Sequence, residues 1–173
     1  MNATNRIEDV MGRMPYGLYI IGSSGGGDVD GMMADWVMQV SFRPRMIAVS
    51  FENDARTLEN LRGTSAFTVN LLSQQATNMT LAARFAQPYY DDKVGGRVER
   101  PSRTHHKLED IDHELTAKGN PILAQAMAWL ECDVDQFLST GDHTLVLGHV
   151  RDGALVRDEE PLTSRFTGWS YSG

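Results

Sequence analysis

Arg56 and Thr57 are neighbouring side chains that could together hold a phosphate. The segment Asn53-Asp-Ala-Arg-Thr-Leu predicts the start of a helix, so the charge of Arg56 and the hydroxyl of Thr57 would lie beside free backbone N–H groups. These three kinds of group together bind a phosphate well. An ordinary first helical turn with a solvated arginine explains the same residues equally well, and on these residues alone both interpretations stay open.

The segment 31–50 precedes that helix and suits a flat ligand. It predicts a strand that turns at 41–44 and returns as a second strand over 46–51, whose continuous apolar character indicates burial on both faces. A backbone-lined strand edge that faces a helix N-terminus would accommodate a flat heterocycle carrying a phosphate. Trp36 and Trp129 favour the core or an interface, although aromatic faces can also border such a ring.

His143 is the titratable residue best placed for chemistry. It follows the Gly141-Asp142 turn at the start of an expected strand, where a side chain often faces a cleft. There it could contact a reacting ring or stabilise its anion. From residue type alone, a partly buried histidine that satisfies a turn is the favoured interpretation. No Ser-His-Asp or paired-carboxylate arrangement stands out, so hydrolysis has no local signature.

Two other motifs favour structural or solvent-exposed roles. The glycine-rich run 23–28 lacks the Gly-Lys-Ser/Thr of a phosphate loop and predicts a hairpin loop, and no G-x-G-x-x-G fingerprint of a Rossmann domain occurs. A second, polar cluster carries metal-ligand chemistry, although such residues more often form solvated surface, so we expect no metal. Its members are His105, His106, Asp110, Asp112 and His113.

Length and composition favour a single globular domain over residues 1–173. The chain has 41% hydrophobic residues and a net charge of −7, and the negative charge argues against a nucleic-acid partner. No apolar run is long enough to span a membrane, and the N-terminus lacks a signal-peptide core, so we expect a cytoplasmic protein. Cys132 is alone, which excludes an internal disulfide and a cysteine metal cage.

Hydrophobic periodicity predicts a few short helices. They are expected at 7–14, 54–63 and 77–85. Asn53 or Asp54 can cap the N-terminus of the second helix, and Gly63 stands where its C-cap belongs. The polar segment 87–114 shows no period, and we expect it to be a functional lid or a mobile excursion.

Alternating or continuous apolar runs predict about six strands. Beyond the strand that starts the segment 31–50, they are expected at 16–21, 46–51, 66–72, 128–134, 143–150 and 169–171. In the strand 66–72, Phe67, Val69 and Leu71 share one face. Strands joined by hairpins, with two or three helices outside them, indicate an α+β fold that is mainly antiparallel, namely a small β-barrel.

The order and spacing of several stretches resemble the flavin reductase-like family of FMN-binding split barrels. The resemblance runs from Pro15 to the end of the chain. The matching stretches include Gly31-Met-Met-Ala-Asp-Trp, Val49-Ser-Phe-Glu-Asn-Asp-Ala-Arg-Thr-Leu, Phe67-Thr-Val-Asn-Leu-Leu-Ser, Leu81-Ala-Ala-Arg-Phe, Ala126-Met-Ala-Trp-Leu-Glu-Cys and Gly141-Asp-His-Thr-Leu-Val-Leu-Gly-His-Val. What the resemblance implies is a split β-barrel with a few flanking helices, a homodimer that holds FMN or FAD at its subunit interface, and reduction of flavin by NADH or NADPH.

The resemblance also implies which residues form the site. The flavin is expected along Gly31, Met32, Met33, Ala34, Asp35 and Trp36, and at the strand end Ser50, Phe51 and Glu52. The phosphate resembles one held by Arg56 and Thr57, with Arg84 and Phe85 of the following helix nearby. His143 matches the family's Gly-Asp-His position beside the nicotinamide side of the flavin, which reverses the interpretation drawn from its residue type.

Two features depart from the family pattern. Asp35 stands where family members often carry Ser, Asn or Gln, and Met32-Met33 replaces a commoner aromatic or Thr-containing pair. A carboxylate near a phosphate weakens binding unless it turns away or pairs with a base such as Arg56.

The leading functional hypothesis is an NAD(P)H-dependent flavin oxidoreductase. It would reduce FMN or FAD and supply reduced flavin to a partner monooxygenase, or electrons to another acceptor. The alternatives are a non-catalytic FMN-binding electron carrier and a split-barrel enzyme that uses a deazaflavin.

Overall fold

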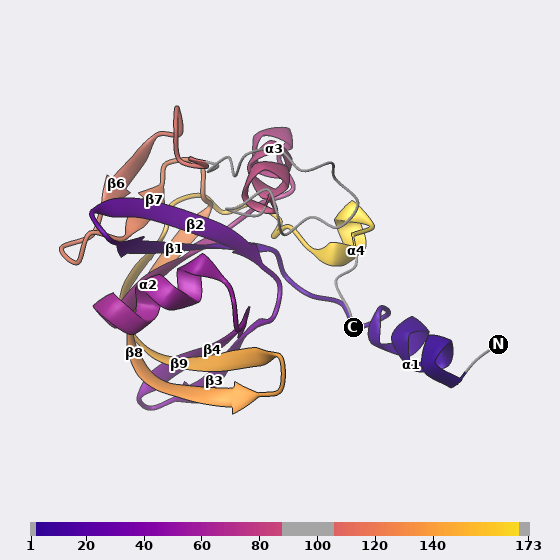
Figure 1. Ribbon diagram of the computed structural model, residues 1–173. Coiled ribbons are helices and arrows are strands. Elements are labelled where there is room, and N and C mark those ends of the chain that lie inside the picture. Colours follow the sequence, from indigo (N-terminus) through magenta and orange to yellow (C-terminus); the bar gives the residue numbers. More distant parts are fainter. Residues whose placement is uncertain (1–2, 88–105, 170–173) are drawn as a thin grey trace, which may run out of the picture.

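The computed structural model describes residues 3–87 and 106–169, and Figure 1 shows strands that enclose a helix, with further helices outside. The elements in chain order are α1 (Ala3–Met11), β1 (Tyr19–Gly25), β2 (Asp28–Ala34), β3 (Val37–Phe42), β4 (Arg45–Glu52), α2 (Arg56–Thr64), β5 (Ala66–Leu71), α3 (Ala76–Phe85), β6 (His113–Leu115), β7 (Pro121–Leu123), β8 (Ala128–Thr140), β9 (His143–Leu155) and α4 (Ser164–Thr167). Seven strands form one sheet in the order β2-β1-β5-β8-β9-β4-β3, and β6 pairs with β7. The described pairings are antiparallel, which confirms the predicted fold class.

The two edge strands of the large sheet, β2 and β3, are consecutive in sequence and joined only by Asp35 and Trp36. Because so short a link keeps the two edges close, the sheet must curl until its edges approach, which produces the barrel. The Trp36 carbonyl accepts a hydrogen bond from the Ser50 N–H (3.0 Å), so the link is docked on β4. In Figure 1, α2 lies between the β1–β2 hairpin and the strands β4, β8 and β9.

Two tight hairpins set the register of this sheet. Gly26 and Gly27, with φ of 62° and 88°, close β1–β2, which is the backbone that a two-residue turn requires. The predicted hairpin is therefore confirmed, but its loop is shorter than 23–28 because the chain stays paired as far as Gly25. Gly141, with φ of 84°, and Asp142 close β8–β9 directly before His143.

The N-terminus of α2 lacks the predicted cap. The N-cap residue is Ala55, which provides no side-chain hydrogen bond, so the prediction of Asn53 or Asp54 is wrong. Asn53 instead donates to the Gly141 carbonyl (3.0 Å) and accepts from the Thr144 hydroxyl (2.7 Å). These bonds tie the end of β4 to the turn that precedes His143.

The C-terminus of α2 also differs from its prediction. The helix runs past Gly63 to Thr64, and the C-cap is Ser65 in the left-handed region with φ of 54°. The Ser65 carbonyl accepts a hydrogen bond from the Val134 N–H (2.9 Å), so pairing with β8 fixes where the helix ends.

Two apolar clusters hold the fold. The first fills the barrel and includes Ile21, Val49, Phe51, Phe67 and Val146. The second lies under α3 and includes Leu18, Ile20, Leu72, Phe85 and Leu162. Strand β1 serves both, because successive strand side chains point to opposite faces. The predicted shared face of β5 is confirmed, since Phe67, Val69 and Leu71 all contribute to the first cluster.

The segment 87–114 is predicted to lack structure, but the structure folds its second part. Lys107 and Leu108 are buried, and His113–Leu115 pairs with Pro121–Leu123. The prediction is wrong for 106–114 because Leu108 joins the second core, a long-range contact that no local period reveals. Residues 88–105, His105 among them, lie outside the described residues.

The two chain ends differ from each other in how well they match expectation. An N-terminal helix is present as α1, but it spans Ala3–Met11 and ends before Met14, so the predicted bounds 7–14 are wrong; Ile7 and Val10 are 65% and 69% exposed. At the other end, Trp169 follows α4 outside any strand, so the predicted strand is wrong at that residue. The remainder of that predicted strand lies outside the described residues.

Candidate functional site

The predicted flavin strip, Gly31 to Trp36, runs along β2, where the edges of the curled sheet approach each other beside β4 and α2. We call this place the seam. Within the described ranges β2 pairs only with β1, so its second edge presents backbone N–H and C=O groups without a strand partner. Met32 and Ala34 pack toward the first core and Met33 toward the second. The strip therefore offers its backbone edge, more than its side chains, to a flat ring.

Phe85 lies directly behind this strip. A Cβ atom at Gly31 would be 2.9 Å from Phe85 Cε1, so close packing explains the glycine. Phe85 is buried in the second core, and Arg84 donates a hydrogen bond to the Glu109 carbonyl in the segment after α3. A contact between either residue and a phosphate stays a prediction.

The end of β4 meets both the strip and His143. Ser50 bonds to Trp36 as described above, while Glu52 lies opposite His143 in the register of β4 with β9. The Phe51 side chain is fully buried in the first core, so only its backbone faces the seam. The structure thus gathers the β4 residues and the strip, as the resemblance implies.

Aromatic and imidazole rings gather at one end of the strip. The centroids of the Trp36 and His143 rings are 4.9 Å apart with an interplanar angle of 40°, and the Tyr16 ring lies 6.5 Å from Trp36. The His143 side chain is only 12% exposed. This cluster can border a ligand ring and present a titratable donor to it.

Asp142 orients His143. The Asp142 Oδ1 atom lies 2.7 Å from His143 Nδ1, and this hydrogen bond lowers the pKa of the Asp142 carboxyl. An ionised carboxylate only accepts hydrogen bonds, so Nδ1 carries the proton.

Asp35 is half-buried beside this ring cluster. Burial raises the pKa of its carboxyl, and three groups oppose that shift: the backbone N–H groups of Asp35 and Trp36, and then the charge of His143. The base that acts on Asp35 is His143, because the link between β2 and β3 runs past the start of β9.

Arg56 and Thr57 open α2, as predicted. Thr57 is 2% exposed, and the N-cap residue supplies no side-chain bond to the first turn. A cation, a hydroxyl and the N-terminus of a nine-residue helix are the donor set that a phosphate requires. These residues fit the anionic end of a flavin nucleotide.

Asp30 and Lys107 form a buried ion pair that the sequence pattern did not indicate. The Lys107 Nζ and Asp30 Oδ1 atoms are 3.7 Å apart, and both side chains are at most 6% exposed. Burial raises the pKa of Asp30, opposed first by Lys107 and more weakly by the Gly31 N–H and Arg56. Burial likewise lowers the pKa of Lys107. The signal was weak, because Lys107 lies within the polar segment 87–114, which shows no period.

The predicted loop cluster does not form a metal centre in the part of the chain that the structure describes. No group of three His, Cys, Asp or Glu side chains there is arranged to hold a metal ion. His113 Nδ1 instead lies 2.7 Å from the Ile111 carbonyl oxygen.

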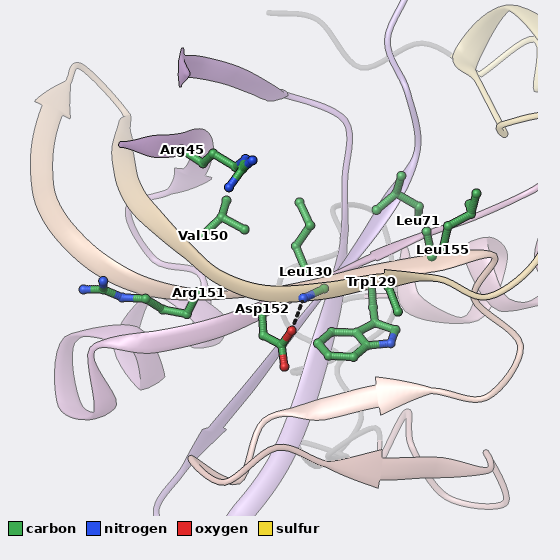
Figure 2. Close-up of a pocket in the computed structure, with 11 residues that line it drawn as sticks. Arg45, Leu71, Trp129, Leu130, Val150, Arg151, Asp152 and Leu155 are labelled. Carbon is green, nitrogen blue, oxygen red and sulfur yellow. Dashed lines mark hydrogen bonds between the residues drawn. The ribbon is translucent and has the colours of Figure 1, made fainter. Parts of the chain in front are cut away.

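A hollow with a volume of about 430 Å³ lies along β8, β9 and the start of β4, apart from the seam. Figure 2 shows Trp129 and Asp152 on one side of the strand ribbon and Arg45, Val150 and Leu130 on the other. None of the predicted site residues lines it. The hollow and the predicted flavin strip are therefore different places.

Comparison with known proteins identifies the family. The model of the flavin reductase-like domain matches residues 11–170. The chain belongs to this family. The seam between β2, β4 and α2 is therefore part of a flavin reductase-like domain, and the split-barrel fold implied by the resemblance is confirmed.

Three proteins illustrate the similarity. The chain is 29% identical over 152 residues to a ferric-chelate reductase (NAD(P)H) of Archaeoglobus fulgidus, which covers 87% of this chain and 82% of that protein. It is 30% identical to diflavin flavoprotein A 1 of Synechocystis sp. over 88% of this chain and 24% of that protein. The structure of the styrene monooxygenase flavin reductase (SMOB) from Pseudomonas putida S12 superimposes with a TM-score of 0.71 and 25% identity, covering 92% of this chain and 91% of that one.

The relatives differ in length. The chain spans about a quarter of the length of the diflavin flavoproteins that it matches.

No helix in the described ranges is long and apolar enough to cross a membrane.

Proposed function

We propose that this chain binds FMN at the barrel seam and catalyses its reduction by NADH or NADPH. The observation that carries the proposal is the contact of the Trp36 and His143 rings, 4.9 Å apart, beside the free edge of β2. Membership of the flavin reductase-like family supports flavin as the cofactor, and a relative named for NAD(P)H supports the nicotinamide. FAD would use the same strip.

The two ends of the seam have different roles in this proposal. Arg56 and Thr57 hold the phosphate, and the backbone edge of β2 binds the rim of the ring. When bound, the flavin supplies the hydride chemistry. His143 is the catalytic residue, placed to donate to the nicotinamide carboxamide or to the negative charge that develops on the ring.

We further propose that the protein is a homodimer with the flavin at the subunit interface. Large apolar side chains on α1 and β3 are exposed in one copy: Ile7 by 65%, Val10 by 69%, Met38 by 64% and Phe42 by 82%. A second copy would cover such surface. A monomer at micromolar concentration in sedimentation, with flavin bound, would contradict this part of the proposal.

The reduced flavin needs an acceptor. The name of the Pseudomonas putida relative assigns it to a styrene monooxygenase. We propose that this chain also hands reduced flavin to a partner monooxygenase, acting as one domain over residues 1–173. The cytoplasmic location stays a prediction.

The visible spectrum tests the proposed function. Purified protein mixed with FMN should show a flavin spectrum that bleaches anaerobically on addition of NADH or NADPH. Bound flavin that neither nucleotide bleaches would support the electron-carrier alternative instead. Absence of flavin binding would refute both.

A further inference from the structure

Tyr16 is an aromatic residue outside the predicted site whose ring packs against that site. The Tyr16 and Trp36 ring centroids are 6.5 Å apart with an interplanar angle of 53°, and the Trp36 and His143 centroids are 4.9 Å apart at 40°. Both separations are typical of packed rings. Trp36 is therefore the ring that Tyr16 and His143 share.

The position of the Trp36 ring depends on the side chains packed around it. Asp35 and Trp36 form the link between β2 and β3 and belong to neither strand. The Ser50 N–H holds the Trp36 carbonyl on β4 (3.0 Å), but this bond fixes the backbone and not the ring. Because packed neighbours restrict a side chain, Tyr16 limits the positions that the Trp36 ring can take against His143.

A segment 148 positions further along the chain fixes Tyr16. The Tyr16 N–H donates to Ser164 Oγ (3.0 Å), and the Tyr16 carbonyl accepts from the Ser164 N–H (2.8 Å). The Leu18 N–H donates to the Leu162 carbonyl (2.9 Å), and both leucines are at most 2% exposed in the second core. We call residues 162–164, which hold Tyr16 in this way, the C-terminal clamp.

Resting on the proposed function, we propose that Tyr16 is a positioning residue that holds the Trp36 ring against His143 and is itself held by the C-terminal clamp. In this role Tyr16 acts only through Trp36, which contacts the proposed catalytic residue. Loss of the Tyr16 ring would give Trp36 and His143 more positions, only some of which suit hydride transfer. The C-terminal clamp thereby contributes to a site that β2, β4 and β9 form.

Four variants separate the Tyr16 ring from its hydroxyl group and its backbone bonds. Tyr16→Ala removes the ring, whereas Tyr16→Phe retains the ring and removes the hydroxyl. Ser164→Ala removes the Oγ acceptor of the C-terminal clamp and leaves every ring in the chain. Phe166→Ala is the matched control, because Phe166 is an aromatic residue that is 51% exposed on α4, close to the clamp.

The first measurement uses the flavin-free protein and reports the ring contact directly. Nuclear Overhauser effects between the Trp36 and His143 ring protons, assigned with Trp36→Leu and His143→Gln, report how closely the two rings approach each other. We expect the effect to fall about twofold or more in Tyr16→Ala, because the packed ring is lost, and to persist in Tyr16→Phe and Phe166→Ala. An unchanged effect in Tyr16→Ala would overturn the proposal.

The second measurement separates positioning from binding. Anaerobic stopped flow at saturating NAD(P)H gives the limiting rate of flavin reduction, and fluorescence titration gives the FMN affinity. In Tyr16→Ala the rate should fall roughly two- to tenfold, the size of a lost aromatic pair, with Tyr16→Phe close to the wild type. The affinity should change less, because the phosphate and backbone contacts remain. Equal losses in rate and affinity would show that Tyr16 binds the flavin and would overturn the positioning role.

Ser164→Ala keeps the proposal testable where Tyr16→Ala does not fold. It should lower the Overhauser effect and the reduction rate in the same direction, by less than the loss of the ring. Wild-type values of both in Ser164→Ala would overturn the role of the C-terminal clamp. A wild type that binds flavin but is not bleached would instead refute the proposed function, while the Overhauser effects would still decide whether Tyr16 holds the ring contact.

Discussion

An aspartate lies near each end of the predicted flavin strip, and the two aspartates have different surroundings. Asp30 directly precedes the strip, and Asp35 lies near its other end. The two carboxylates are five residues apart, roughly 16 Å along a strand, and burial raises the pKa of both. Asp30 forms an ion pair with Lys107 and is also influenced by the charge of Arg56, whereas Asp35 lies near His143. In the proposed function the first end holds the phosphate, and the second borders the reacting ring.

The largest expected effect concerns the buried pair at the anion end. Lys107→Met leaves the Asp30 carboxylate buried without its main partner, so the free energy of unfolding should fall by about 3–5 kcal/mol. Urea unfolding of the variant and the wild type measures this fall in the free energy of unfolding. The double variant Asp30→Asn/Lys107→Met should recover most of the loss, and a Lys107→Met protein as stable as the wild type would show that the pair is not closely coupled.

Arg56→Ala tests whether this end binds the phosphate. The variant should bind FMN about 1.5–3 kcal/mol more weakly, the size of a charge-assisted hydrogen bond, while riboflavin affinity stays nearly constant because the ring contacts remain. Fluorescence titration with both ligands gives the comparison. Equal losses for the two ligands would place Arg56 away from the phosphate.

The variant His143→Ala tests the end of the flavin strip that lies near Trp36. The rate of flavin reduction by NAD(P)H should fall about tenfold or more, equivalent to roughly 1.4 kcal/mol per decade, with little change in FMN affinity. Anaerobic stopped flow separates the two quantities. Reduction at the wild-type rate would remove His143 from the chemistry.

The smallest effect is a pH dependence of stability at Asp35. Because burial raises the Asp35 pKa above its ordinary 3.8, the folded protein binds this proton more tightly than the unfolded chain does. That stabilisation is complete below pH 3.8 and is lost as the pH rises through the folded-state value. Asp35→Asn should therefore gain stability relative to the wild type between pH 3.5 and pH 7, measured by urea unfolding at both. A difference that does not vary with pH would contradict the raised pKa.

The sequence predicted the parts of this molecule that local pattern determines. The alternating faces of β5 and the Gly141-Asp142 turn before His143 follow from side-chain period and turn chemistry, and the structure confirms them. The family resemblance added to these local predictions the split-barrel arrangement of the strands and helices. It also led to the Trp36 segment and His143, which residue type alone did not bring together.

The missed features depend on long-range contacts. Asn53 is a sound helix cap by residue type, but the turn before His143 takes its side chain. The pairing of Lys107 with Asp30 joins residues 77 positions apart through two buried charges, which no periodicity reveals. The closeness of Asp35 and His143 likewise depends on how the barrel closes, because Asp35 lies on the link between β2 and β3 whereas His143 begins β9.

A crystal structure of the protein with FMN tests the central claim most directly. We expect the phosphate within hydrogen-bond distance of Arg56 and Thr57, and the ring along the β2 edge beside Trp36 and His143. FMN bound instead in the hollow lined by Trp129 and Asp152, with the seam empty, would contradict the account.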